Sequence, residues 1–111
     1  MRRLARLTLV AAAVATPMLA APASASTDAA MARGMAQAGR ACLKASELKN
    51  AAIVGEPILF SDATGKTAIL VTGRWRPAHM RNARATMLCL YDRSTRRAET
   101  QEALRWTVAA R

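Results

Sequence analysis

The side chains best suited to binding chemistry gather in one short stretch, residues 74–84. The stretch combines four arginines, the only histidine of the chain and a tryptophan: Arg74, Trp75, Arg76, His79, Arg81 and Arg84. Guanidinium groups offer paired donors in one plane, which suits phosphate and carboxylate groups. An indole beside them can stack on a sugar or an apolar chain. We therefore take this stretch as a candidate anion-binding surface; the alternative is a charged loop that is simply solvated.

The same region also contains candidate metal ligands. His79 and Met80 offer an imidazole and a thioether, which suit copper or haem, and Met31 and Met35 lie one helical turn apart. A metal site usually needs more than one histidine, however, and methionines at helical spacing are typical of a core. We expect no metal site and no cofactor.

Catalytic residues are not indicated. The chain has seven carboxylates: Asp28, Glu47, Glu56, Asp62, Asp92, Glu99 and Glu102. Glycoside hydrolysis requires two of them about 5–9.5 Å apart across a cleft, but Glu99 and Glu102 are three residues apart on a predicted strand and point to opposite faces. Ser61 and Ser94 lie in predicted turns, outside the strand-to-helix context of an activated serine. We expect a non-catalytic protein, with a small cell-wall hydrolase as the alternative.

The two cysteines, Cys42 and Cys89, predict one intramolecular disulfide. Cys42 lies on the apolar side of a predicted helix, and Cys89 lies in the middle of a predicted strand. Neither belongs to a Cys-x-x-Cys pair, so the predicted role is structural. For a small domain with a thin core, such a cross-link is an important source of stability.

One helix must position the first cysteine. From about residue 28 to residue 48, apolar residues recur at steps of three and four, at Met31, Met35, Ala38, Cys42, Ala45 and Leu48. Ser26 and Thr27 are candidate N-caps, followed by an acidic residue in the first turn. Lys49 and Asn50 are expected to end the helix, with Asn50 as a left-handed cap.

Four strands should follow the helix, at residues 51–60, 67–75, 86–93 and 98–108. The segment at Pro57 is expected at an edge or a bulge, because proline cannot donate to a strand ladder. Residues 61–66 are rich in turn formers, and residues 94–97 form a second predicted turn. A helix followed by an antiparallel meander predicts an α+β fold, in which one N-terminal helix packs on a four-stranded sheet.

The third predicted strand has two apolar faces. If Cys89 faces the helix, then Leu88 and Leu90 point to the opposite face, which a single helix cannot cover. That face is covered by the C-terminal segment with Trp106, by a second copy of the chain, or by a partner. We therefore add Leu88 and Leu90 to the candidate binding surface.

The first 25 residues read as a cleaved secretory signal peptide. Three arginines precede an apolar run at residues 7–20, and small residues follow at 21–25. Residues 26–111 would then form a single small domain that is periplasmic or secreted. The chain has 17 basic and 7 acidic residues; without the three leader arginines, 14 basic residues face 7 acids, a net charge of +7.

This positive charge indicates an anionic partner. Export argues against nucleic acid and in favour of phospholipid head groups, lipopolysaccharide or cell-wall polymers. The leading hypothesis is therefore a non-catalytic binding module of the cell envelope, which engages a protein partner or an anionic polymer. Peripheral contact with a membrane and a structural homodimer are further alternatives.

Two resemblances accompany this interpretation. The segment at residues 89–99, read Cys-Leu-Tyr-Asp-Arg-Ser-Thr-Arg-Arg-Ala-Glu, resembles the closing hairpin of PepSY-type domains, small secreted modules associated with peptidase inhibition. Such hairpins usually carry glycine where Arg96 or Arg97 stands. Residues 26–111 as a whole resemble small exported bacterial proteins of unknown function. Neither resemblance transfers a catalytic residue.

Overall fold

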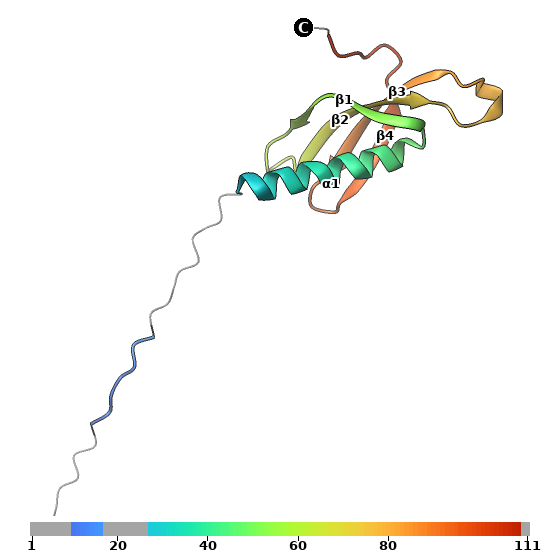
Figure 1. Ribbon diagram of the computed structural model, residues 1–111. Coiled ribbons are helices and arrows are strands. Elements are labelled where there is room, and N and C mark those ends of the chain that lie inside the picture. The colour runs from blue at the N-terminus through green and yellow to red at the C-terminus, as the bar shows by residue number, and fades with distance from the viewer. Residues whose placement is uncertain (1–9, 17–26, 110–111) are drawn as a thin grey trace, which may run out of the picture.

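A single helix lies across one face of an antiparallel sheet (Figure 1). The computed structural model describes residues 10–16 and 27–109, so most of the predicted signal peptide lies outside the described residues. The elements are α1 (Asp28–Ser46), β1 (Lys49–Leu59), β2 (Lys66–Arg74), the 3₁₀-helix η1 (Ala78–Met80), β3 (Arg84–Asp92) and β4 (Arg97–Glu102). The strand order β1-β2-β3-β4 is a meander. The predicted α+β fold is confirmed.

Helix α1 begins where the sequence predicted and ends earlier. The Thr27 hydroxyl accepts a hydrogen bond from the Ala30 N–H at 3.1 Å, which satisfies one of the free donors of the first turn. At the other end, Glu47 adopts a left-handed conformation with φ of 56°, and its N–H donates to the Lys44 carbonyl. The prediction of Asn50 as the cap is wrong. Asn50 is also left-handed, with φ of 50°, but it lies within β1 at an irregularity of the strand.

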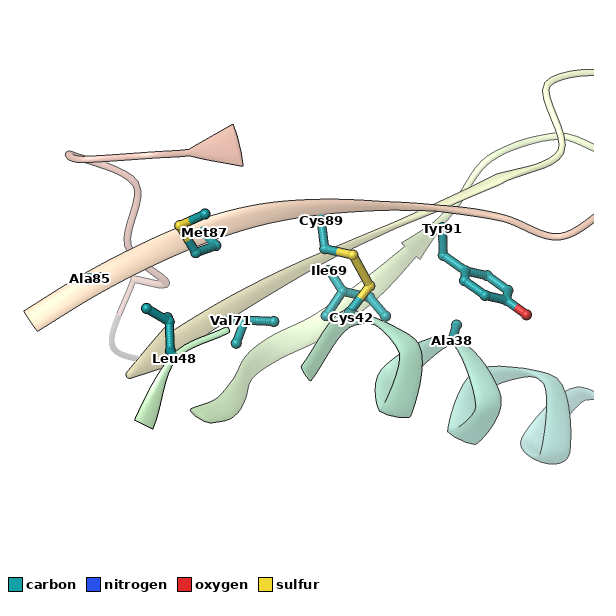
Figure 2. Packing of buried hydrophobic residues seen from close by; sticks show 9 residues of the cluster. All are labelled: Ala38, Cys42, Leu48, Ile69, Val71, Ala85, Met87, Cys89 and Tyr91. Carbon is teal, nitrogen blue, oxygen red and sulfur yellow. A yellow bond between two sulfur atoms is a disulfide. The ribbon is translucent and has the colours of Figure 1, made fainter. Parts of the chain in front are cut away.

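The core lies between α1 and the sheet face that carries Thr67, Ile69 and Val71 (Figure 2). The buried residues of the helix, Ala38, Gly39, Cys42 and Ser46, all lie in its second half, whereas Met31 is half exposed. The reason is that the first turns of α1 lie beside the β1–β2 turn rather than over the centre of the sheet.

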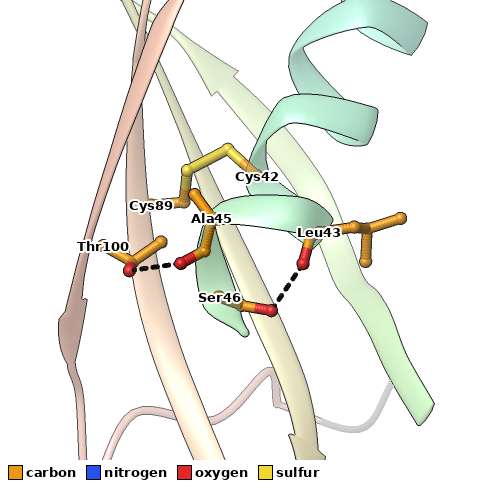
Figure 3. The surroundings of a disulfide bond; sticks show 6 residues. All are labelled: Cys42, Leu43, Ala45, Ser46, Cys89 and Thr100. Carbon is orange, nitrogen blue, oxygen red and sulfur yellow. Dashed lines mark hydrogen bonds between the residues drawn. A yellow bond between two sulfur atoms is a disulfide. The ribbon is translucent and has the colours of Figure 1, made fainter. Parts of the chain in front are cut away.

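The predicted disulfide joins α1 to β3 in the middle of this core. The Cα atoms of Cys42 and Cys89 are 5.7 Å apart, and both residues are fully buried. Beside it, the Thr100 hydroxyl of β4 donates a 3.2 Å hydrogen bond to the Ala45 carbonyl near the helix end (Figure 3). The helix is therefore fastened to two neighbouring strands. A buried disulfide of this kind indicates an oxidising environment outside the cytoplasm.

Strand β1 approaches β2 closely at one glycine. A Cβ atom at Gly73 would lie 2.7 Å from the Lys49 carbonyl oxygen and 2.8 Å from the Leu48 Cβ. Only glycine lets the backbone of β1 pass at this distance. The close approach holds the start of β1 against β2. Leu48, the residue that directly precedes β1, is therefore buried in the core.

The predicted fourth strand is too long. It was expected to reach residue 108, but β4 ends at Glu102. The Ala103 N–H still donates to the Thr86 carbonyl, and the Trp106 N–H then donates to the Ala103 carbonyl, which closes a turn. The C-terminal tail, residues 103–109, lies on the side of the sheet away from α1 (Figure 1). We call that side the back face.

Candidate binding surface

The basic hairpin, residues 74–84, joins β2 to β3 and extends beyond the end of the helix (Figure 1). The Trp75 N–H donates to the Ala83 carbonyl at 3.0 Å, so the ladder continues past β2. The tip contains η1 and a left-handed pair, Arg81 and Asn82. His79 and Arg81 are exposed there. The sequence holds no acidic residue between Asp62 and Asp92, so no carboxylate within the hairpin offsets these charges.

Two of the predicted site residues serve the fold instead of a free surface. The Arg76 guanidinium donates to the Glu47 carbonyl at 2.9 Å and to the Leu48 carbonyl at 3.2 Å. These carbonyls lie at the C-terminal end of α1, where a positive charge is favourable. Trp75 packs partly buried against the core on the same side of the sheet.

A pair of arginines occupies the back face at the base of the hairpin. Arg74 on β2 and Arg84 on β3 are direct cross-strand partners, and neither forms an ion pair with any described residue. Like charges at opposing positions destabilise a sheet. The two arginines border a polar pocket of about 230 Å³ that also includes Asn50, Thr72 and Thr86.

An apolar groove lies farther along the same face. It has a volume of about 460 Å³ and draws its lining from β1, β2, β3 and the tail; among the lining residues are Val54, Ile58, Leu70, Leu88, Leu90 and Trp106. Several of these side chains stay open to solvent: Ile58 is 62% exposed, Trp106 56% and Leu90 40%. The tail therefore borders this back-face groove without filling it.

The structure distributes the eight predicted site residues over three places. Trp75 and Arg76 lie at the helix end, His79 and Arg81 at the hairpin tip, and Arg74, Arg84, Leu88 and Leu90 on the back face. Asn50, Thr72 and Thr86 were not predicted as site residues. The alternation along β2 and β3 is a signal that could have found the two threonines, because they share the parity of Arg74 and Arg84.

Comparison with known proteins adds no further constraint. No protein-family model, no curated protein and no solved structure matches this chain. The likeness to PepSY-type domains and to small exported proteins stays a prediction.

Two features of the described residues bear on the alternatives of a membrane anchor and a metal site. No helix within residues 10–16 and 27–109 has the length and apolar character needed to cross a membrane. Over the same residues, no three His, Cys, Asp or Glu side chains gather as metal ligands would. His79 and Met80 lie beyond the C-terminal end of α1, whereas Met31 and Met35 belong to its first turns, so the structure does not bring these four together (Figure 1).

The acidic residues Glu99 and Glu102 of β4 do not face each other as the two carboxylates of a catalytic pair would. Glu99 pairs with Leu90 on the back face, and Glu102 pairs with Met87 on the helix side, so the two point to opposite faces as predicted.

Asp92 accepts a 2.6 Å hydrogen bond from the Lys66 ammonium group and further bonds from Ser94 and Thr95. The Lys66 bond, followed by those from Ser94 and Thr95, lowers the pKa of Asp92 well below its ordinary value of 3.8. Asp92 is thus a carboxylate that holds a turn and stays ionised.

This environment predicts an acid-dependent loss of stability. Because the pKa of Asp92 is lower in the folded protein than in the unfolded chain, its contribution is complete above the ordinary carboxyl pKa and disappears as the pH falls toward the folded value. Asp92→Asn should be less stable than the wild type near neutral pH, and the difference should shrink below about pH 4.

Urea midpoints from about pH 7 to about pH 2 test this expectation. The matched control is Asp62→Asn, because Asp62 is fully exposed and only loosely paired with Arg93 at 3.7 Å. If both variants lose stability equally, or if the gap between Asp92→Asn and the wild type is constant across the pH range, the role assigned to Asp92 is wrong.

Proposed function

We propose that this protein is a non-catalytic binding module of the cell envelope that engages an anionic component through its basic hairpin. The observation that carries the proposal is the hairpin itself. It projects beyond the helix, presents His79 and Arg81 at its exposed tip, and belongs to a stretch of sequence without acidic residues (Figure 1). Arg81 and Arg84 are exposed and form no ion pair with any described residue. Such arginines suit head groups and polymers that carry phosphate or carboxylate.

The location in the envelope rests on two further observations. A buried disulfide belongs to an oxidising compartment, and residues 1–25 have the pattern of a secretory signal peptide. We therefore propose that the mature chain is periplasmic or secreted. In that compartment the anionic partners are head groups and envelope polymers, or a protein with an acidic surface, and nucleic acid is not expected.

Charge reversal at the hairpin tests the proposal. Arg81→Glu combined with Arg84→Glu should weaken binding to vesicles that contain phosphatidylglycerol by about tenfold or more, since each basic residue near an anionic surface contributes about 1 kcal/mol. Cosedimentation at low and at high salt measures the effect. Arg76 is unsuitable for this test because it holds the end of the helix.

The matched control is Arg33→Glu combined with Arg40→Glu. It makes the same charge change at two exposed positions of α1, away from the hairpin. The proposal predicts that the control binds nearly as well as the wild type, and that pure phosphatidylcholine vesicles bind neither protein. Equal losses in both variants would mean that only net charge matters and would contradict a role for the hairpin.

A further inference from the structure

We propose that the back face binds a single-chain anionic amphiphile, a long-chain fatty carboxylate, with its acyl chain in the back-face groove and its head group at Arg74 and Arg84. The inference deepens the proposed function by naming a ligand class for one part of the basic surface. It rests on three features that share the back face: an open apolar groove, two neighbouring arginines that form no ion pair with any described residue, and the polar pocket that these arginines border. The Arg74 guanidinium also donates a 2.9 Å hydrogen bond to the Asn82 carbonyl.

The groove has the character of an acyl-chain site. Its volume of about 460 Å³ lies within the range of small-ligand sites, about 300–1,000 Å³. The sheet contributes apolar side chains from three strands, and the tail adds Trp106 and Val108. Val108 packs against Gly55, where a Cβ atom would lie 2.7 Å from the Val108 Cγ2, so the tail is anchored on β1 as well as at Thr86. The two anchors hold Trp106 at the side of the groove.

The arginine pair supplies the complementary charge at one end. Arg74 and Arg84 lie four residues along their strands from Leu70 and Leu88, which corresponds to about 13 Å at roughly 3.3 Å per residue. The side chains between the groove and the arginines are Thr72 and Thr86, which offer hydroxyl groups. The face thus changes from apolar to polar to cationic along one direction, as an amphiphile with an anionic head requires.

A second copy of the chain fits this face less well. Pairing two back faces would bring together two chains that each carry a net charge of +7 after removal of residues 1–25. It would also bury Arg74 and Arg84, which form no ion pair with any described residue. The charge therefore favours an anionic ligand as the occupant.

Tryptophan fluorescence of the exported, purified protein tests the proposal. Trp75→Phe leaves Trp106, which is 56% exposed beside the groove, as the only tryptophan. Titration with sodium dodecanoate should shift its emission to the blue as the chain covers the indole. Along the series octanoate, decanoate and dodecanoate, binding should strengthen by up to about fourfold per methylene. Butyrate, with the same head group and almost no chain, should give no shift.

The head group is tested separately. Dodecyl maltoside has a neutral head and an alkyl chain one carbon longer than that of dodecanoate, yet it should bind at least about tenfold more weakly than dodecanoate. Arg74→Gln with Arg84→Gln should reduce the affinity for dodecanoate to that for dodecyl maltoside. The matched variant, Arg33→Gln with Arg40→Gln, removes the same charge from exposed positions of α1 and should leave the affinity unchanged.

The groove has its own pair of variants. Leu90→Gln replaces a lining residue and should weaken dodecanoate binding, whereas Leu104→Gln makes the same change at an 80% exposed tail residue that does not line the groove and should have no effect. Because the ligand series uses unaltered groove residues, it remains decisive even if Leu90→Gln fails to fold.

Three results would overturn the inference. The first is an affinity for the fatty carboxylates that does not depend on their chain length, and the second is equal affinity for dodecanoate and dodecyl maltoside. The third is a blue shift of the Trp106 emission that depends on the protein concentration and not on the ligand concentration, because this would indicate a second copy on this face. A blue shift with anionic vesicles but none with monomeric dodecanoate would also reject a free carboxylate as the ligand. Unchanged vesicle binding in the hairpin variant Arg81→Glu with Arg84→Glu, together with a retained chain-length series in the protein with an unaltered hairpin, would instead contradict the proposed function alone.

Discussion

Reduction of the Cys42–Cys89 disulfide is expected to lower the free energy of unfolding by about 4 kcal/mol. The cysteines are 47 residues apart, and closing a loop of that length in the unfolded chain removes conformational entropy worth about 4 kcal/mol in the chain-entropy model. A small domain has about 5–15 kcal/mol in total, so the cross-link is a large share of its stability. The midpoint temperature should fall by roughly 15–30 °C, from about 4–8 °C per kcal/mol for a domain of this size.

Two forms of the protein separate the cross-link from the packing of the sulfur atoms. Wild-type protein unfolded with and without a reductant reports the cross-link, because the side chains are otherwise unchanged. Cys42→Ala with Cys89→Ala removes both the bond and two fully buried sulfur atoms, so it should be at least as unstable as the reduced protein. Urea or thermal unfolding measures both. A reduced protein within about 0.5 kcal/mol of the oxidised one would contradict the importance given to the bond.

The second large effect is expected for Ile69→Ala, which should cost about 2–5 kcal/mol. Ile69 is 2% exposed and lies between β2 and α1, where the fixed disulfide limits how far the surroundings can collapse into the space (Figure 2). Urea unfolding measures the loss.

Leu90→Ala is the matched control for that substitution. Leu90 is of similar size and lies on the neighbouring strand, but it points to the back face and is 40% exposed. Leu90→Ala should lower the free energy of unfolding markedly less than Ile69→Ala does. If the two substitutions cost the same, the back face is as well covered as the helix side, and the groove described here is not open to a ligand.

The sequence was sufficient to predict the layers of the fold. The spacing of apolar residues located α1, and turn-forming residues separated the strands, whose predicted limits in β2 and β3 differ from the observed ones by one or two residues. The disulfide was predicted from the expected export and from the positions of Cys42 and Cys89 on facing elements. These features depend on local chemistry, which a sequence displays directly.

The errors arose where local patterns have two outcomes. The alternation of Leu104, Trp106 and Val108 suits a strand, but it equally suits an extended tail that crosses a sheet face, and only tertiary contacts decide between them. Similarly, Glu47 took the left-handed cap expected of Asn50, because β1 must start at once for Leu48 to enter the core. Intrinsic preference for the left-handed region favours Asn over Glu by too little to override packing.

The candidate site was predicted in its residue types and not in its arrangement. Adjacent residues of a strand point to opposite faces, so Arg74, Trp75 and Arg84 could not all share one surface once β2 and β3 paired. The sequence predicted a second apolar face at Leu88 and Leu90 and left open whether the C-terminal segment, a second copy or a partner covers it. Its walls at Ile58 and Trp106 depend on the bulges of β1 and on the path of the tail, which no short-range pattern in the sequence specifies.

The most direct test of the whole account is to map dodecanoate binding on the purified, disulfide-bonded protein by ¹⁵N–¹H correlation NMR. We predict that the amide signals that shift with ligand belong to the back face, along Thr72–Arg74, Arg84–Leu90 and the tail at Trp106, while the signals of α1 on the disulfide-tied side stay in place. Shifts that concentrate on α1, or a spectrum that dodecanoate leaves unchanged, would contradict a sheet with one closed face and one ligand-binding face.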